Sequence, residues 1–388
     1  MSRVLLGDVA VEHKETCKGS KDGYPIVGLE HLIPEEITLT AWDEGSENTF
    51  SKMFRKGNVL FGRRRAYLKK AAVAPFDGIC SGDITVIEAK PDYILPELLP
   101  FIIQNDNLFD FAVGKSAGSL SPRVKWEHLK NYEFELPDME KQKELAELLW
   151  AMDNTKKSYQ KLIAATDELV KSQFMEQFGD PSNNVYGYPV TTLKEVAVGP
   201  LSYGSVSSAT EFDGITRYVR ITDIMDDGNL GGDIKSATKT DAKYLLHEGD
   251  ILFARTGATV GKTCRYRENY GRAIYAGFLI RLIPDTTLID PDYLYHFTKS
   301  DYYWDFVRSA QRVVAQPNIN AQEYGDLQIL LPKIEAQKSF AAFVQQSDKS
   351  KFAVQSCSNL NLSGQLAIRI SPVIPLPQGG VHNGEISV

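Results

Sequence analysis

The sequence lacks the marks of several protein classes. Its four cysteines are scattered, with no C-x-x-C pair, so we expect reduced thiols and neither a disulfide framework nor a zinc site. No apolar run approaches the length of a membrane span, and the first residues lack the apolar core of a signal peptide. These absences predict a cytoplasmic protein. A chain of 388 residues that is 43% hydrophobic can form two or more globular domains.

Motifs for catalysis are also scarce. The Asn/Asp-Pro-Pro-aromatic motif of adenine methyltransferases is absent, and the six histidines show no metal-ligand spacing. Residues 257–263 (GATVGKT) resemble a phosphate-binding P-loop, but one residue is missing between the glycines. The following residues, 264–267, have the pattern of a strand, where a P-loop would open a helix. We therefore predict that no metal or nucleotide binds to this chain.

One acidic cluster leaves an enzymatic alternative open. Asp77, Glu88 and Lys90 could hold Mg²⁺ and an attacking water, as in a stand-alone Mg²⁺-dependent nuclease. The corresponding positions in the second half of the chain carry Ile283 and Asp285, so the two halves could not share this chemistry. A second alternative is a coiled-coil scaffold that binds protein alone.

A long internal repeat is the strongest positive feature. Residues 57–61 (GNVLF) return as residues 249–253 (GDILF), 192 positions further on (249 − 57). Leu136-Pro137 with Gln142 returns 195 positions on (331 − 136) as Leu331-Pro332 with Gln337. A repeat of this length indicates two whole domains of similar fold.

The two copies have the composition of β-rich α+β domains. Short segments rich in β-branched and aromatic residues lie between glycine, proline and aspartate breakers, and a helical stretch follows in each copy. The overall prediction is an α+β protein: two pseudo-repeated β-rich domains joined by long coiled-coil-like helices, with an irregular C-terminal tail. The predicted boundaries are residues 1–137 and 180–332 for the domains, 138–179 and 333–357 for the helices, and 358–388 for the tail.

The segment from Asp138 to Phe178 contains neither glycine nor proline. Asp138 can cap the start of a helix, and Gly179 can end it. Apolar residues follow a 3-4-3-4 spacing that is typical of a coiled-coil seam and calls for a partner helix. The candidate packing residues of this helix are Leu145, Leu148, Met152, Tyr159, Leu162 and Leu169.

The second copy of the helix is the natural partner. Phe340, Phe343 and Val354 continue the seam, but Ser347 interrupts it. Asn359, Asn361, Ser363 and Gly364 are weak helix formers, and prolines begin at Pro372. We therefore expect this helix to end near Cys357, at about half the length of the first.

Basic residues cluster at equivalent places in the two copies, although the net charge is −7. The field at the contact surface governs binding to a polyanion, so local clusters matter more than the total. Their recurrence favours contact with phosphates over a solvated edge. The clusters are Arg63, Arg64, Arg65, Lys69 and Lys70 in the first copy, and Arg255, Lys262, Arg265 and Arg267 in the second.

A polar segment precedes each long helix, at residues 114–123 and 311–320. Arginine and lysine suit guanine, asparagine and glutamine suit adenine, and serine suits phosphate. For any single residue, a loop that caps the next helix is the better explanation, but the two loops together favour DNA contact. The candidate DNA contacts in these segments are Lys115, Ser119, Ser121, Arg123, Arg312, Gln316, Asn318 and Asn320.

Together these patterns resemble the specificity subunit of type I restriction-modification systems. The resemblance rests on the doubled Gly-[Asn/Asp]-hydrophobic-Leu-Phe motif, the polar loops and the Leu-Pro-x4-Gln helix starts, over residues 1–357. It implies that each domain is a target-recognition domain for one half of a split DNA site. The helices would set the spacing between half-sites and dock two methyltransferase subunits, with restriction subunits joining through the complex. S-adenosylmethionine, ATP and Mg²⁺ would belong to those partners.

The chain departs from the family pattern at its end. A full-length second helix is expected, whereas the pattern here is lost near Cys357. This puts in doubt the full pairing of the helices, one methyltransferase docking site and the activity of the complex.

Overall fold

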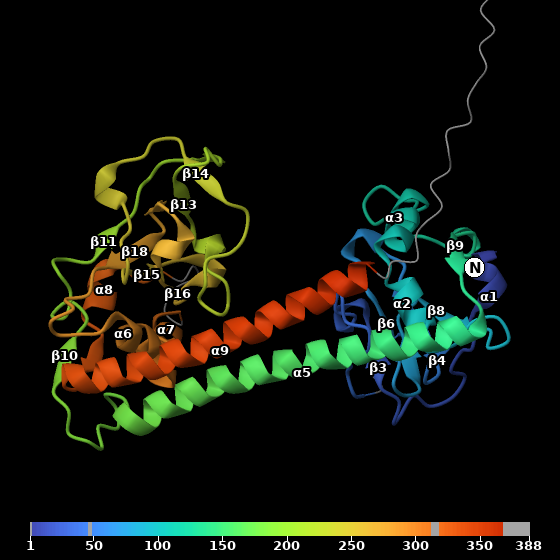
Figure 1. Cartoon of the computed structure of the whole chain (residues 1–388), viewed down its shortest axis with the longest axis horizontal. Coiled ribbons are helices and arrows are strands. Elements are labelled where there is room, and N and C mark those ends of the chain that lie inside the picture. Colours follow the sequence, from blue (N-terminus) through green and yellow to red (C-terminus); the bar gives the residue numbers. More distant parts are fainter. Residues whose placement is uncertain (1, 46–48, 312–317, 368–388) are drawn as a thin grey trace, which may run out of the picture. The chain divides into compact units, whose positions relative to one another are not determined.

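The computed structural model describes residues 2–45, 49–311 and 318–367, with the side chains of the last helix described as far as Lys351. The chain forms two compact units (Figure 1). Unit 1 comprises Met1–Tyr159 with Ser356–Val388, and unit 2 comprises Gln160–Gln355. In the described part of the chain, no helix is long and apolar enough to cross a membrane.

Unit 1 is built around a four-stranded antiparallel sheet in the order β2-β8-β5-β6. A second sheet, β3-β7-β4, contains one parallel pair, β3 with β7. The N-terminal strand β1 pairs with β9, directly before the long helix. The strands are β1 Ser2–Leu5, β2 Ala10–Glu12, β3 Ile26–Val27, β4 Lys52–Phe54, β5 Val59–Gly62, β6 Ala71–Val73, β7 Gly78–Cys80, β8 Ile84–Ala89 and β9 Glu133–Leu136; the helices and turns are α1 Leu6–Val9, η1 Leu29–His31, η2 Ala66–Leu68, α2 Leu99–Ile103, α3 Asp106–Gly114 and α4 Trp126–Leu129.

Unit 2 repeats this topology. Its four-stranded sheet has the order β11-β18-β15-β16, β13 pairs in parallel with β17, and β10 pairs with β19. An antiparallel pair, β12 with β14, is added. The strands are β10 Val190–Thr192, β11 Ser202–Tyr203, β12 Ala209–Glu211, β13 Arg217–Val219, β14 Lys235–Ala237, β15 Ile251–Ala254, β16 Thr263–Arg265, β17 Ala273–Tyr275, β18 Leu279–Leu282 and β19 Gln328–Leu330; the helices and turns are η3 Ile221–Asp223, η4 Ala242–Tyr244, η5 Gly257–Thr259, η6 Glu268–Tyr270, α6 Pro291–Phe297, α7 Asp301–Gln311 and α8 Ala321–Gly325.

The repeated Gly-[Asn/Asp] motif forms the same turn before β5 and before β15. Gly57 and Gly249 have φ angles of +90° and +89°, which favour glycine. The Asn58 Oδ1 atom accepts a hydrogen bond from the Arg55 amide, and Asp250 Oδ2 accepts one from the His247 amide. The motif therefore starts the central strand of each sheet, and its role in both units is structural.

The repeated glutamine has an equally well-defined role. The Oε1 atom of Gln142 accepts from the Leu95 amide, and its Nε2 group donates to the carbonyls of Pro137 and Tyr93. Gln337 makes the same set of bonds in unit 2, with Asp290, Pro332 and Leu288 in those places. Both side chains are buried. Each glutamine thus joins the first turn of a long helix to its own domain.

The first long helix, α5 (Met139–Phe178), begins one residue after and ends one residue before the predicted bounds of 138 and 179. Asp138 caps its start by accepting from the Lys141 amide, and Gly179 follows its end with a φ of +68°. The second, α9, spans Ile334–Ala367, ten residues beyond the predicted end at Cys357 (367 − 357). The predicted half-length helix is therefore wrong. Weak helix formers such as Gly364 cost at most about 1 kcal/mol each, and no proline occurs before Pro372, so the helix continues. The predicted irregular tail beyond Ala367 lies outside the described residues.

The buried face of α5 differs from the predicted seam. In unit 1 the helix buries Gln142, Ala146 and Asp153, and in unit 2 it buries Val170, Phe174 and Phe178. Leu148, Leu162 and Leu169 are instead 47%, 51% and 53% exposed, so the described chain leaves about half of each residue uncovered. The face of α5 that lies next to the predicted seam packs against the two domains instead. It does so because the domains offer the apolar surface on which a helix face can be buried. Leu145, Met152 and Tyr159 are partly buried.

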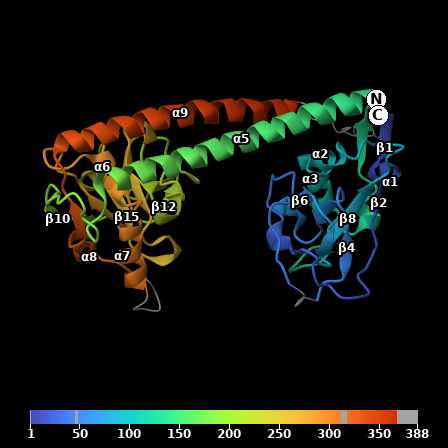
Figure 2. The same cartoon turned by 90° about the horizontal axis from the view of Figure 1, so that it is seen from below.

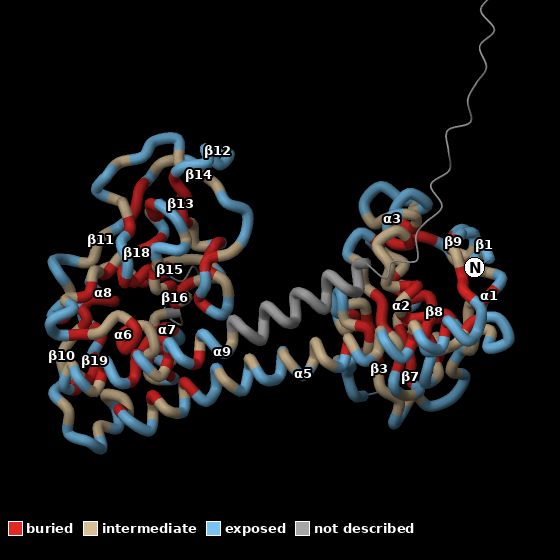
Figure 3. The backbone as a smooth tube through the Cα atoms, in the orientation of Figure 1, coloured by how far each residue is buried: buried red, intermediate tan, exposed pale blue. Residues whose placement is uncertain are grey.

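Within unit 2, α5 and α9 lie side by side and α6 packs against them (Figures 1 and 2). Phe174 contacts Phe340 with ring centroids 5.4 Å apart, and Phe178 contacts Tyr293 at 4.9 Å. Phe340 is fully buried and Phe343 partly so, as the seam predicted, while the side chain of Val354 lies outside the described part. The core of each unit lies in its strands and adjoining helices, with the loops exposed (Figure 3).

Candidate nucleic-acid interface

In unit 1 the backbone brings the predicted arginine cluster and the polar loop together. Strand β5 ends at Gly62, and the carbonyl of Arg63 then accepts from the Val124 amide at 3.0 Å. The Arg65 amide donates to the carbonyl of Pro122 at 2.8 Å. An isolated bridge between Arg64 and Arg123 completes the pairing. Residues that are 59 positions apart in the sequence therefore form one surface (123 − 64).

Two of these arginines are held by a single carboxylate. Arg123 donates to Asp83 through Nε at 2.7 Å and Nη2 at 3.2 Å, and Arg64 Nη1 lies 3.5 Å from the same group. The other nitrogens of Arg64 donate to Ser121 Oγ. The bond from Arg123 holds the pKa of Asp83 below its usual value. We call Arg64, Asp83, Ser121 and Arg123 the arginine clasp. It fixes the polar loop against the end of β5.

Beside the clasp lies a tight turn with unusual backbone angles. Arg65 and Lys69 bracket η2 with φ angles of +53° and +51°, a left-handed region that non-glycine residues adopt rarely. The turn exposes Tyr67, while Lys69 pairs with Asp106 at 2.6 Å. Arg65 is exposed, and its side chain makes no hydrogen bond or ion pair with another described residue.

The remaining candidate residues of unit 1 are divided between solvent and internal contacts. Lys70 donates to the carbonyl of Leu29 at 2.7 Å, and Lys115 lies 5.8 Å from the centroid of the Phe111 ring. Ser119 is exposed at the tip of the loop. The unit 1 surface thus contains the clasp, an unpaired Arg65 and an exposed polar tip.

Unit 2 has the same backbone arrangement with different side chains. The carbonyl of Arg255 accepts from the Ile319 amide at 2.9 Å, and Thr256 bridges to Asn318. Arg255 Nε donates to Asn318 Oδ1 at 3.1 Å. Its guanidinium carbon lies 4.7 Å from the centroid of the Tyr203 ring.

Tyr203 was not predicted from the sequence. It lies on β11, 52 residues before Arg255 (255 − 203), in a two-residue strand with no motif around it. Its hydroxyl oxygen accepts from the Ala321 amide at the start of α8, at 3.0 Å. The tyrosine is therefore fixed at both ends, and sequence alone gave no signal for its contact with Arg255.

The other predicted contacts of the second cluster lie elsewhere. Arg265 pairs with Glu248 at 3.1 Å and lies 3.2 Å from Asp292, and Arg267 pairs with Asp348 at 3.3 Å. Arg265 is opposite Ile251, at the start of β15, whereas Arg255 follows the end of that strand. The structure does not bring Arg265 and Arg267 together with Arg255.

Three further predictions concern Lys262 and the loop before α8. Lys262 pairs with Asp226 at 2.6 Å. Asn320 caps α8 by accepting from the amides of Gln322 and Glu323, so its side chain has a structural role. Arg312 and Gln316 lie outside the described residues.

The pattern of the type I restriction modification DNA specificity domain matches residues 6–165 and again residues 189–359. The chain belongs to this family. Its two matched segments correspond to the two copies of the sequence repeat.

Individual relatives agree with this assignment. The specificity subunit of the type I restriction enzyme EcoDI from Escherichia coli is 26% identical over 174 residues, which is 44% of this chain and 35% of that protein. The match thus spans about a third of that relative's length. An S subunit crystal structure from M. genitalium covers 94% of both chains at 12% identity with a TM-score of 0.56. A chain from a type I R-M system covers 94% and 95% at 20% identity, with a TM-score of 0.53. These two structures share the fold.

In this specificity-domain protein, the residues of the nuclease alternative are not assembled. Asp77 accepts from the Lys56 amide and from Arg55, and these bonds lower its pKa. Glu88 pairs with His13 at 2.7 Å, whereas Lys90 donates to the carbonyls of Gly7 and Asp8. Each group therefore has its own structural partner, and the three have none in common.

The P-loop-like segment has no P-loop geometry. Residues Gly257–Thr259 form a 3₁₀ turn, and β16 (Thr263–Arg265) follows in place of a helix, as predicted. A phosphate-binding loop needs the N-terminus of a helix after its glycines. Nucleotide binding at this segment has no structural support.

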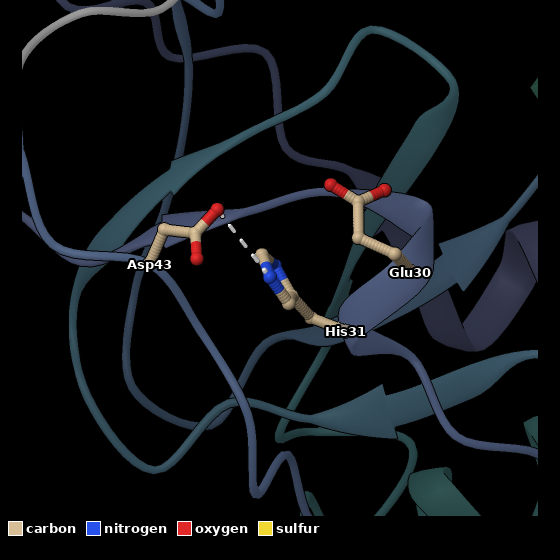
Figure 4. Close-up of side chains that lie close together, drawn as sticks. All are labelled: Glu30, His31 and Asp43. Atoms are coloured by element: carbon tan, nitrogen blue, oxygen red, sulfur yellow. Dashed lines mark ion pairs between the residues drawn. The ribbon is translucent and has the colours of Figure 1, made fainter. Parts of the chain in front are cut away.

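One group of potential metal ligands lies in unit 1, formed by Glu30, His31 and Asp43 (Figure 4). His31 Nδ1 accepts from the Gly28 amide at 3.0 Å, and Nε2 lies 3.6 Å from Asp43. The backbone of Asp43 pairs with Ile26. Glu30 and Asp43 are exposed. The bond from the Gly28 amide gives His31 a structural role in closing the η1 turn. We therefore assign no metal site here.

Unit 2 also contains a cavity of about 420 Å³ between α5, α6, α9 and the loop at Asp226–Asn229. Most of the charges that line it are paired, for example Lys351 with Asp167 and Asp348 at 2.7 and 2.8 Å. Burial lowers the pKa of Lys299 to about 8 and that of His296 to about 3. The Lys299 ammonium group lies 4.6 Å from the centroid of the Tyr295 ring. Acidic and basic side chains line this cavity in similar number, so it has no marked preference for an anion.

Proposed function

We propose that this chain is the DNA-recognition subunit of a type I restriction-modification complex and has no catalytic role of its own. Each unit reads one half of a bipartite DNA site. The observation that carries this proposal is the doubled surface at the ends of β5 and β15, where the same backbone pairing presents arginines beside a polar loop. Unlike side chains at equivalent places, such as Arg123 and Asn318, predict unlike half-sites and hence an asymmetric target.

The helices supply the second part of the proposal. A long α-helix is stiff, so helices that join two reading units can fix the distance between half-sites, as in dimeric DNA readers. Leu148, Leu162 and Leu169 lie 14 and 7 residues apart (162 − 148 and 169 − 162), both multiples of a heptad. They are about half exposed and leave an apolar stripe on α5. We infer that methyltransferase subunits dock on this stripe, and that restriction subunits join through them. S-adenosylmethionine, ATP and Mg²⁺ then act on those partners, in the cytoplasm.

Mapping of modified adenines tests this function. The chain is expressed with its methyltransferase subunit in a host without other adenine methylation, and the genome is read for methylated positions. We expect one bipartite, asymmetric motif with a fixed gap. A symmetric motif, or none in a complex that contains both subunits, would overturn the proposal.

Salt dependence separates DNA reading from a scaffold that binds protein alone. Neutralised phosphates release counterions, so the affinity of the complex for DNA should fall steeply as salt rises. Fluorescence anisotropy with a labelled duplex measures this slope. A complex that binds no DNA at low salt supports the scaffold, and a purified chain that cuts DNA with Mg²⁺ supports the nuclease.

A further inference from the structure

The guanidinium group of Arg255 is held from two directions before any DNA is present. One face stacks on the Tyr203 ring at 4.7 Å, and the Nε edge donates to Asn318 at 3.1 Å. Both supports are themselves fixed: Tyr203 through its bond from Ala321, and Asn318 through its bridge with Thr256. An arginine that is stacked and anchored in this way loses little further freedom when it binds.

The remaining edge of Arg255 is available. Its Nη1 and Nη2 groups donate to no other residue that the structure describes, and no carboxylate pairs with them. Two parallel N–H groups match the O6 and N7 acceptors of guanine in the major groove, the commonest specific arginine contact. The arginines of the clasp differ, since Arg64 and Arg123 are engaged with Asp83 and Ser121.

The surroundings of Arg255 favour a base over a phosphate. The neighbouring Phe278, whose carbonyl accepts from the Arg255 amide, is 60% exposed, and Tyr203 is 42% exposed. The apolar Phe278 side chain can contact base edges and thymine methyls, but it has no hydrogen-bond donor for a phosphate. At the equivalent place in unit 1 the carbonyl that accepts from Arg63 belongs to Asp83, a charged residue.

We propose that Arg255 reads a guanine in the half-site recognised by unit 2, with Tyr203 and Asn318 as the residues that position it. This inference rests on the proposed function. It assigns the choice of one base to a single side chain.

The test compares Arg255→Lys with the control Arg308→Lys, an exposed arginine of unit 2 that pairs with Asp305. Each variant is assembled with its methyltransferase subunit, and its methylation motif is mapped. Binding is measured on duplexes that carry the wild-type motif or one changed base. For Arg255→Lys we expect a 10- to 100-fold loss of discrimination at one guanine of one half-site, and no change in the other half-site. The control should keep the wild-type motif.

Variants of the positioning residues distinguish the roles. Tyr203→Leu and Asn318→Ala should weaken discrimination at the same guanine, by less than Arg255→Lys does, while the identity of the preferred base is kept. Equal melting temperatures check that the variants fold.

Two results would overturn the inference. Arg255→Lys could weaken binding to all duplexes equally, while Arg255→Ala, which removes the charge, lowers the salt slope by about one; together these are the signature of a phosphate contact. Arg255→Lys could also leave the motif unchanged. In both cases the wild-type complex still has a bipartite motif, so the proposed function stands. A wild-type complex without such a motif would contradict the proposed function itself.

Discussion

At the scale of single residues, the two units hold the arginines beside their polar loops with different chemical groups. In unit 1 a carboxylate, Asp83, orders two arginines and through them a loop. In unit 2 an aromatic ring and an amide order one arginine. The arrangement in unit 1 rests on ion pairs with Asp83, whereas the one in unit 2 leaves an edge of the Arg255 guanidinium group free. Because the two units present different hydrogen-bonding groups, we expect them to read different bases.

His296 provides a prediction on pH dependence. Burial lowers its pKa to about 3, and the charged groups around it are Asp348, Lys351, Lys299 and Arg267. The unfolded chain takes up a proton near pH 6.5, whereas the folded chain stays neutral, so stability falls as pH drops below 6.5. The slope reaches about 1.4 kcal/mol per pH unit for one such group.

The variant His296→Phe should lose this contribution. The free energy of unfolding of unit 2 is measured by urea denaturation between pH 6.5 and 4.5. The contribution of His296 is the difference between the pH slopes of the wild type and the variant. The exposed His128→Phe variant is the control and should keep the wild-type slope. Parallel pH profiles for wild type and His296→Phe would show that the histidine is solvated in the native state.

At the scale of elements, the repeated motifs maintain the fold. Gln142 and Gln337 each satisfy three backbone groups at the start of a long helix. Replacement of Gln337 by leucine leaves the Asp290 amide and two carbonyls unpaired in a buried place. Each orphaned group costs about 1–3 kcal/mol.

We therefore expect Gln337→Leu to destabilise unit 2 by roughly 3–5 kcal/mol, and Gln142→Leu to do the same in unit 1. Chemical denaturation provides the measurement. Gln346→Leu, on the exposed face of α9, is the matched control and should change the free energy of unfolding by less than about 0.5 kcal/mol. Equal losses for Gln337→Leu and the control would mean that the buried bonds contribute little.

The sequence predicted the local structure better than the contacts. The strand starts after Gly57 and Gly249 and the bounds of α5 follow from short-range rules of turns and caps. The end of α9 was missed, because weak helix formers lower stability without stopping a helix. The spacing of Leu148, Leu162 and Leu169 predicts an internal seam, but these residues are about half exposed. Spacing alone does not say which face of a helix finds a partner.

The sequence predicts part of the candidate site, because it shows which residues are close along the chain but not which strands pair. Arg64 and Arg123 fall together because strand pairing joins their segments, and both belonged to predicted clusters. Arg265 and Arg267 are close to Arg255 in sequence, but an antiparallel strand carries them to the other end of β15. Tyr203 comes from a distant edge strand, and no local pattern reports such a neighbour.

At the scale of the whole molecule, the two units have separate cores, and each has its own proposed DNA-reading surface. The arginine clasp and Arg255 belong to different units and share no partner in the described structure. Energetic effects at sites without shared partners usually add. The two half-sites should therefore respond independently to changes in the two units.

This independence is tested in the assembled complex with three variants: Asp83→Ala, Arg255→Lys and the double variant. Asp83→Ala frees Arg64 and Arg123 and loosens the polar loop, so discrimination should fall in the half-site read by unit 1. Arg255→Lys should affect the other half-site. In the double variant the two fold-losses in affinity should multiply. The coupling free energy between the two changes should then be below about 0.5 kcal/mol. Fluorescence anisotropy on singly mismatched duplexes measures these affinities. A larger coupling, or a change by Asp83→Ala in both half-sites, would mean that the units read DNA as one surface, and the bipartite model would need revision.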